Sequence, residues 1–187
     1  MKILFVTAEK PEADACRRAV LESGVPADVV FSGMGAEATR RTMEKKDLSE
    51  YDYVIDAGIA GSFTGAELGA AYNVLEERNW EDTAVTFTGA LPLFGNLPCA
   101  KGLTVQQMSG DVDLVSARRS LGADVESMEG AAFFEVCLAH GVRHFAELRT
   151  ISNEVGEIRR EKWDINLALD AIYKACLDFL STLKESR

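Results

Sequence analysis

Val125-Glu126-Ser127-Met128-Glu129-Gly130-Ala131-Ala132 and, about two dozen residues later, Arg149-Thr150-Ile151-Ser152-Asn153 are the two segments from which the architecture can be worked out. The first is a strand-like run whose acid opens a helix of small residues, and the second is a strand-like run that ends in an amide. A carboxylate accepts hydrogen bonds from two hydroxyls, whereas an amide both donates and accepts. At neighbouring strand ends the pair can bind a sugar diol and a heterocyclic base together, which predicts chemistry at an N-glycosidic bond.

Strands and helices alternate along most of the chain. The predicted strands are Lys2 to Thr7, Ala27 to Phe31, Tyr53 to Asp56, Tyr72 to Leu75, Gly102 to Gln107, Asp124 to Ser127 and Phe145 to Ile151. The predicted helices are one that begins near Pro11 and others that cover Ala36 to Lys46, Val112 to Ser120, Glu129 to His140 and Trp163 to Lys184. This alternation predicts an α/β fold, a three-layer sandwich in which helices flank a central mixed, twisted sheet, built as a single domain over residues 1–187. The stretch 64–101 has little regular pattern.

The composition restricts the possible partners. The 187 residues include 20 basic and 30 acidic side chains, a net charge of -10 that repels nucleic acids and anionic membranes. No apolar stretch reaches transmembrane length and the first residues lack a signal-type segment, so we expect a cytoplasmic protein. The four cysteines are scattered and Gly141 separates His140 from His144, so we expect reduced packing cysteines and no metal or other cofactor.

The candidate functional residues gather at one edge of the predicted sheet. In α/β sheets, ligands bind beyond the carboxyl ends of the strands. The candidates that follow predicted strands are Glu12, Gly58, Met128, Glu129 and Asn153. We interpret the run from Gly58 to Ser62, which includes Ile59, as a turn whose glycines let a ligand approach the backbone closely.

The acid of the first segment is suited to hold a ribose. Cleavage of a nucleoside develops positive charge on the sugar and negative charge on the leaving base. Glu129 is the candidate for orienting the two ribose hydroxyls, with Met128 packing on the sugar face. The alternative is that Glu129 is only an acid at a helix N-terminus, where the helix dipole favours it.

The attacking water needs a base, and Glu12 at the end of the first strand is the candidate. Glu9 lies close enough in the sequence to be its rival. Both acids can also be solvated charges of a loop and a first helical turn, and their spacing alone does not separate these interpretations.

The amide of Asn153 is suited to hold a purine. It can donate to O6 while accepting from a protonated N7 of hypoxanthine or guanine, although an asparagine can also pair with adenine. The alternative role is a loop asparagine that caps the following turn. The neutral amide favours a 6-oxopurine.

At these residues the sequence resembles the superfamily of nucleoside phosphorylases and methylthioadenosine/adenosylhomocysteine nucleosidases, and within it the futalosine hydrolases. The segments that carry the resemblance are Met1 to Ala8 with Glu12 behind it, Ser32 to Gly35, Ala57 to Phe63, Val125 to Phe133, Ile151 to Gly156 and Lys162 to Ile165. The resemblance covers both ends of the chain well and its middle poorly.

The resemblance implies a role for each candidate. It implies Glu12 and Asn153 as catalytic residues, the first activating water and the second facing the purine N7 and O6. It implies a substrate-binding set of Gly58, Ile59, Val125, Ser127, Met128 and Glu129. Because the adenine-specific nucleosidases carry aspartate where Asn153 stands, the implied substrate is futalosine, a hypoxanthine nucleoside of menaquinone biosynthesis. The resemblance also implies a homo-oligomer, and Met108 or Phe87 is the candidate for contacting the base.

Three other functions compete with hydrolysis. A phosphorylase would need an anion site, for which only Arg17, Arg18 and the backbone amides near Gly33 are available. A dinucleotide-dependent oxidoreductase is suggested by the run Gly33 to Ala38 with Asp52 or Asp56 behind it, but this run follows the second strand. A non-catalytic nucleoside-binding protein would keep the pocket and lose the reaction.

Overall fold

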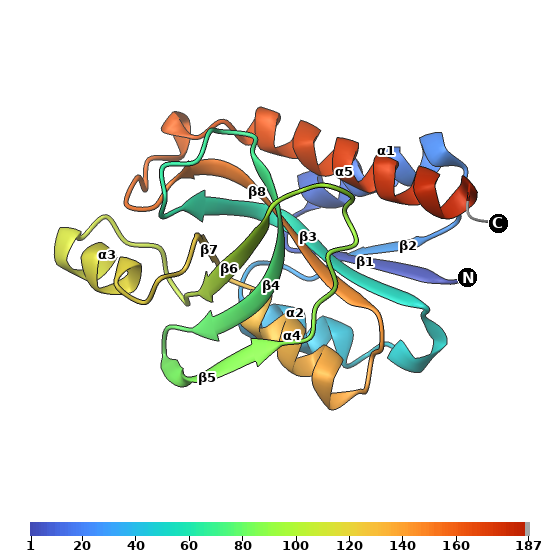
Figure 1. The fold of residues 1–187 in the computed structure, drawn as a ribbon, viewed down its shortest axis with the longest axis horizontal. Coiled ribbons are helices and arrows are strands. Elements are labelled where there is room, and N and C mark those ends of the chain that lie inside the picture. Colours follow the sequence, from blue (N-terminus) through green and yellow to red (C-terminus); the bar gives the residue numbers. More distant parts are fainter. Residues whose placement is uncertain (186–187) are drawn as a thin grey trace.

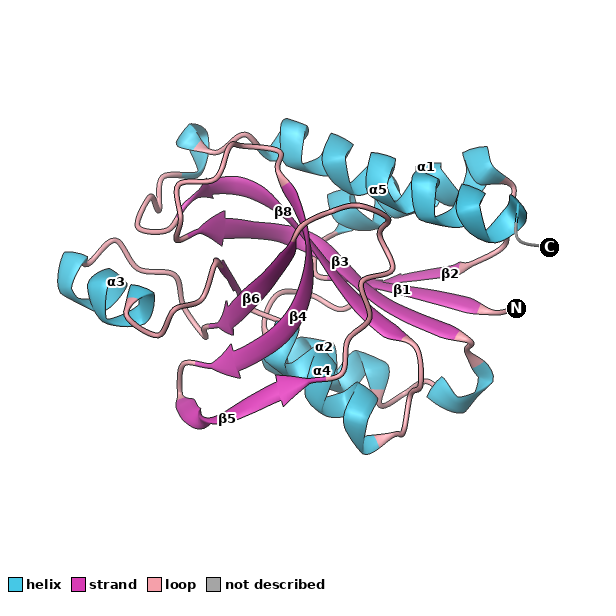
Figure 2. Cartoon of the chain, in the orientation of Figure 1, coloured by secondary structure: helices cyan, strands magenta, loops and turns pink. Residues whose placement is uncertain are grey.

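The computed structural model describes residues 1–185, which form one eight-stranded sheet with helices on both faces (Figures 1 and 2). The strands are β1 (Ile3–Thr7), β2 (Asp28–Phe31), β3 (Tyr53–Ser62), β4 (Ala71–Asn79), β5 (Asp82–Thr88), β6 (Cys99–Thr104), β7 (Val125–Ser127) and β8 (Phe145–Glu154). The helices are α1 (Lys10–Ser23), α2 (Ala36–Met43), α3 (Val112–Arg119), α4 (Gly130–Ala139) and α5 (Ile165–Glu185), with short 3-10 turns η1 (Leu48–Glu50) and η2 (Arg160–Lys162).

Strand β1 shows why the protein has three layers. Its five residues are all buried, and successive side chains of a strand point to opposite faces. Ile3 and Phe5 pack in the core under α1 and α5, whereas Leu4 and Val6 pack in a second core with residues of α2 and α4. Figure 1 shows these two pairs of helices on opposite sides of the sheet. The predicted three-layer α/β sandwich is confirmed.

The sheet is mixed and partly closes on itself. Its strand order is β2-β1-β3-β7-β6-β4-β5, and β8 pairs in parallel with β3 and antiparallel with β4. Strands β3, β7, β6, β4 and β8 therefore form a closed ring of paired neighbours. The ring brings the ends of β3, β7 and β8 close together, and both segments singled out in the sequence lie there.

Two predicted boundaries at this place are wrong. The run from Gly58 to Ser62 is not a turn, because its backbone continues β3 and pairs with β8. Strand β8 is also longer than predicted, so Asn153 lies inside the strand and not after it. A bulge in the register between Ala60 and Gly61, opposite Ser152, marks this extension.

The middle of the chain, 64–101, is more regular than its sequence indicates. It forms β4, β5 and the start of β6, and each of these strands is held by pairing with residues distant in the sequence or by a hairpin. Within residues 1–185 no helix is both long and apolar enough to cross a membrane. Cys16, Cys137 and Cys176 are buried free thiols, but Cys99 is exposed and is not the packing residue that we predicted.

Candidate functional site

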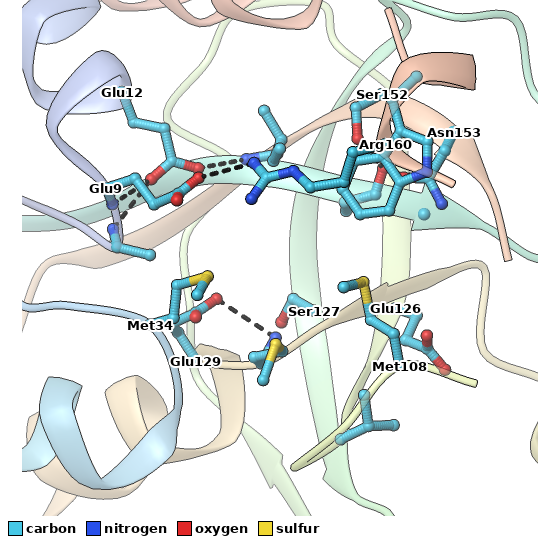
Figure 3. Close-up of a pocket in the computed structure, with 17 residues that line it drawn as sticks. Glu9, Glu12, Met34, Met108, Glu126, Ser127, Glu129, Ser152, Asn153 and Arg160 are labelled. Carbon is cyan, nitrogen blue, oxygen red and sulfur yellow. Dashed lines mark hydrogen bonds and ion pairs between the residues drawn. The ribbon is translucent and has the colours of Figure 1, made fainter. Parts of the chain in front are cut away.

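A cavity of about 600 Å³, including space open to solvent, lies where β3, β7 and β8 end (Figure 3). The residues that line it are Ala8, Glu9, Glu12, Met34, Ile59, Ala60, Gly61, Val105, Met108, Glu126, Ser127, Met128, Glu129, Ser152, Asn153, Arg160 and Trp163. The structure thus brings six of the predicted site residues to one cavity: Glu12, Ile59, Ser127, Met128, Glu129 and Asn153.

Glu12 is held in the first turn of α1 with its carboxylate turned back toward the sheet. Its side chain is only 3% exposed, and its oxygens accept hydrogen bonds from the backbone N–H groups of Ala8 (3.0 Å), Glu9 (2.8 Å) and Ile59 (2.9 Å). Burial raises the pKa of Glu12 to about 7, although the backbone hydrogen bonds oppose this shift. Because it is buried and hydrogen-bonded, Glu12 is not a solvated charge of a first helical turn. A carboxylate with this pKa can accept a proton near neutral pH.

Glu9, the rival acid, differs from Glu12 in its surroundings. It lies at the rim of the cavity, its side chain is 32% exposed, and an oxygen of its carboxylate is 3.3 Å from a guanidinium nitrogen of Arg160. Figure 3 shows Glu9 directed toward Arg160. Glu9 is thus partly solvated and engaged with Arg160 at the rim, whereas the Glu12 carboxylate is buried inside the cavity.

Glu129 lies at the boundary between β7 and α4 but makes no capping hydrogen bond to the helix. Its carboxylate instead accepts from the backbone N–H of Gly35 (2.8 Å) and of Met128 (3.2 Å), and the side chain is 6% exposed. Gly35 belongs to the loop before α2, so Glu129 joins two distant segments at the cavity wall. The Glu129 carboxylate is therefore held by specific hydrogen bonds and is not only an acid that the helix dipole stabilises at a helix N-terminus.

The amide of Asn153 keeps part of its hydrogen-bonding capacity free. Its oxygen accepts from the hydroxyl of Ser152 (2.8 Å), and its nitrogen donates to the carbonyl of Glu154 (2.9 Å). An amide oxygen accepts two hydrogen bonds and an amide nitrogen donates two, so one acceptor position and one N–H remain for a ligand. Gly61 makes room here, since a Cβ on it would lie 3.2 Å from the Asn153 nitrogen.

A buried cation lies behind the two candidate carboxylates. Arg149 is 1% exposed, and its guanidinium contacts Asp56, the Glu147 carboxylate (2.6 Å) and the Glu129 carboxylate (3.8 Å). Burial raises the pKa of Asp56 and of Glu147, and the Arg149 charge opposes both shifts. Asp56 therefore forms a buried ion pair with Arg149 and is not placed to bind the ribose of a dinucleotide.

Gly58 does not line the cavity but separates Arg149 from Glu12. A Cβ at this position would lie 2.3 Å from a guanidinium nitrogen of Arg149 and 3.1 Å from a carboxylate oxygen of Glu12. The absence of a side chain therefore lets the Arg149 guanidinium and the Glu12 carboxylate approach each other. Its predicted use, close approach of a ligand to a turn, does not match this position inside β3.

Gly58→Ala is expected to displace Arg149 and Glu12 by about 1 Å and to lower kcat by about 100-fold, because catalysis is sensitive to the placement of the reacting groups. Steady-state kinetics on the variant measures this loss. Gly110→Ala is the matched control, since its Cβ would make only ordinary contacts of 3.4 Å or longer. Equal activity of the two variants would show that Gly58 has no special role.

Some predicted residues lie elsewhere, and some lining residues were not predicted. Val125 does not reach the cavity, because it packs in an apolar cluster with Ala60 and Ile151. Of the two candidates for contacting the base, Met108 lines the cavity, whereas Phe87 packs in the core beside α4. The lining residues that the sequence left without a role are Ala8, Met34, Val105, Glu126, Ser152, Arg160 and Trp163.

The groups that a phosphorylase would need for an anion site make other contacts. Arg17 pairs with Asp14 and Arg18 lies over the ring of Tyr173, so neither lines the cavity. The Gly35 amide is occupied by Glu129. Among residues 1–185, no group of three His, Cys, Asp or Glu side chains is arranged to hold a metal ion.

Comparisons with known proteins agree with this geometry. The phosphorylase superfamily profile matches residues 84–185. A futalosine hydrolase of Thermus thermophilus is 33% identical over 83% of this chain and 77% of its own length, and one of Streptomyces coelicolor is 30% identical over 94% and 93%.

Solved structures share the fold at lower identity. The native futalosine hydrolase of Helicobacter pylori strain 26695 matches with a TM-score of 0.80 and 18% identity, over 100% of this chain and 98% of its own. A methylthioadenosine/adenosylhomocysteine nucleosidase of Colwellia psychrerythraea 34H, solved with adenine, matches with a TM-score of 0.80 and 19% identity, over 98% and 96%. The fold alone therefore does not distinguish the two activities.

Proposed function

The chain belongs to the phosphorylase superfamily and, within it, to the futalosine hydrolase family, and from this premise we propose that it hydrolyses the N-glycosidic bond of futalosine. The products are hypoxanthine and dehypoxanthine futalosine, in menaquinone biosynthesis. The observation that carries the proposal is a single cavity that contains a buried carboxylate, a second buried carboxylate and a free amide edge: Glu12, Glu129 and Asn153.

Glu12 activates the attacking water in this proposal. Its pKa of about 7 lets it take a proton as the water attacks the sugar carbon. The three backbone N–H groups hold the carboxylate in place, so little reorganisation accompanies the reaction.

Glu129 orients the ribose. Its carboxylate is fixed by Gly35 and Met128 and can accept hydrogen bonds from the sugar hydroxyls. Its negative charge also stabilises the positive charge that develops on the sugar ring. Ser127 and Met128 line the same wall and complete the sugar site.

Asn153 receives the leaving base. Its free N–H donates to O6 and its free acceptor position takes N7–H, so the negative charge of the departing hypoxanthine is stabilised as it forms. The amide cannot itself give up a proton, and the proton on N7 comes from solvent or a relay.

Water is the proposed nucleophile, since a phosphorylase would need a cationic anion site beside the sugar. Of the lining residues only Arg160 is cationic, and it is paired with Glu9 at the rim. Incubating the protein with futalosine, aminofutalosine, inosine and methylthioadenosine, with and without phosphate, tests the proposal. Hypoxanthine released from futalosine without phosphate supports it, and a requirement for phosphate contradicts it.

The assembly and location remain part of the proposal. The family resemblance favours a homo-oligomer acting in the cytoplasm. Light scattering on the purified protein tests the assembly, and a monomer at working concentration would contradict it.

A second candidate function is hydrolysis of methylthioadenosine or adenosylhomocysteine, favoured by the fold shared with such nucleosidases. Asn153→Asp is expected to raise the ratio of kcat/KM for methylthioadenosine to that for futalosine by about tenfold or more. A carboxylate repels O6 of hypoxanthine but accepts from the N6 amino group of adenine.

Asn79→Asp is the matched control for this change, because Asn79 ends β4 away from the cavity. It should leave the substrate ratio as it is in the wild type. If Asn153→Asp also leaves the ratio unchanged, Asn153 does not distinguish hypoxanthine from adenine.

A further inference from the structure

Acidic side chains outnumber basic ones among the residues that line the cavity, although Arg118 pairs with Glu126 and Arg149 contacts Glu129 from behind the cavity wall. Four of its lining residues are acids: Glu9, Glu12, Glu126 and Glu129. Futalosine carries a benzoate group on the 5′ side of its ribose, and a carboxylate entering such a cavity needs a compensating cation. Arg160 is the one cationic side chain among the lining residues.

Arg160 lies at the mouth of the cavity. Its side chain is 50% exposed, so it stands at the mouth while Glu12 and Asn153 are buried inside. Figure 3 shows the side chain of Arg160 extending from the side of Ser152 and Asn153 toward Glu9. Its guanidinium lies 3.3 Å from the Glu9 carboxylate, so the site already binds a carboxylate of the protein itself.

Trp163 places an aromatic surface beside this cation. The Arg160 guanidinium is 5.5 Å from the centre of the Trp163 ring, and the ring nitrogen donates to the carbonyl of Glu157 (2.8 Å). The backbone N–H of Asp164 donates to the carbonyl of Ser152 (2.9 Å), which ties this loop to the end of β8. These hydrogen bonds hold the Trp163 ring next to the Arg160 guanidinium at the cavity mouth.

We propose that Arg160 binds the carboxylate of the substrate's benzoate group, displacing Glu9, while Trp163 packs on the aromatic ring. The assignment rests on the proposed function and names the part of the site that selects futalosine among hypoxanthine nucleosides. A guanidinium suits this task because it binds a carboxylate through two parallel hydrogen bonds. An aromatic ring adds apolar contact area for the benzoate ring.

The test compares futalosine with its methyl ester, which keeps the ring but lacks the negative charge. For the wild type we expect KM for the ester to exceed KM for futalosine by about tenfold, the lower end of what a hydrogen bond to a charged group contributes. For Arg160→Gln we expect the two KM values to be equal within about twofold, because the group that distinguishes the acid from its ester is gone. Glu9→Gln should lower KM for futalosine, because it removes the competing carboxylate.

Arg159→Gln is the matched control, since Arg159 is exposed, pairs with Glu157 and does not line the cavity. It should preserve the tenfold preference for the acid. If Arg160→Gln preserves that preference too, or if the wild type has none, the assignment is wrong. If the wild type releases no hypoxanthine from either compound, the proposed function itself fails.

Discussion

Glu12→Gln is expected to lower kcat for futalosine by about 10²–10⁴-fold, the range that a positioned general base contributes. Glutamine has nearly the same shape as glutamate but cannot take a proton from water. Substrate binding should persist, because the groups proposed to hold the sugar and the base, Glu129 and Asn153, are unchanged. Single-turnover release of hypoxanthine, with binding measured by calorimetry, separates the two effects.

Asp14→Asn is the matched control for this loss. Asp14 lies on the same helix, but its side chain is 49% exposed and pairs with Lys10 and Arg17 outside the cavity. Its removal should leave kcat within about twofold of the wild type, as for most surface changes. A Glu12→Gln variant as active as this control would remove Glu12 from the mechanism.

The wild type should show a matching pH dependence. Burial raises the pKa of Glu12 to about 7, so the ionised base is the major form above this pH and is lost below it. We expect kcat/KM to fall about tenfold per pH unit well below pH 7, and the Glu12→Gln variant to lack this limb. A rate that stays constant from pH 8 to pH 5 would contradict the assignment of Glu12.

Arg149→Met should have the largest effect on stability, lowering the free energy of unfolding by about 3–5 kcal/mol. The change leaves the carboxylates of Asp56 and Glu147 buried without their cation. This is a large part of the stability of a typical domain, so urea unfolding should move to a much lower midpoint.

Arg119→Met is the matched control, because the ion pair of Arg119 with Glu154 is long (3.7 Å) and both side chains are exposed. Such a pair contributes about 0–1 kcal/mol. Adding Asp56→Asn to Arg149→Met should restore part of the stability, since it removes one unpaired buried charge. Equal unfolding midpoints for Arg149→Met and Arg119→Met would show that the buried network does not stabilise the fold.

The parts of the fold that the sequence predicted are those with a local pattern. Strand β1 is a continuous apolar run, and α5 repeats its apolar residues at helical spacing, so both were found. Strands β4 and β5 were missed or shortened because they are stabilised by pairing with distant strands. The extension of β3 through Gly58 was missed for the same reason, since glycines in a sequence indicate a turn more often than a strand.

The site residues likewise fall into those that the sequence indicated and those that it did not. Glu12 and Glu129 follow strands and Asn153 is the last residue but one of β8, so the topology places all three at one edge of the sheet. The sequence did not indicate the buried ion-pair network of Arg149, because a basic residue in a strand gives no sign that three acids surround it. Arg160 begins η2 and Trp163 directly follows it, and hydrogen bonds to the end of β8 and within the segment hold this part of the chain beside the cavity.

We propose that this cavity hydrolyses a hypoxanthine nucleoside with Glu12 as the base. The most direct measurement is the release of hypoxanthine from futalosine at pH 8 in phosphate-free buffer, followed by chromatography for the wild type and for Glu12→Gln. We predict full conversion by the wild type and at least about a 100-fold slower release by the variant. Release of adenine from methylthioadenosine but of no hypoxanthine from futalosine would show that the proposed substrate is wrong. Equal rates of hypoxanthine release by the two proteins would show that Glu12 is not the base.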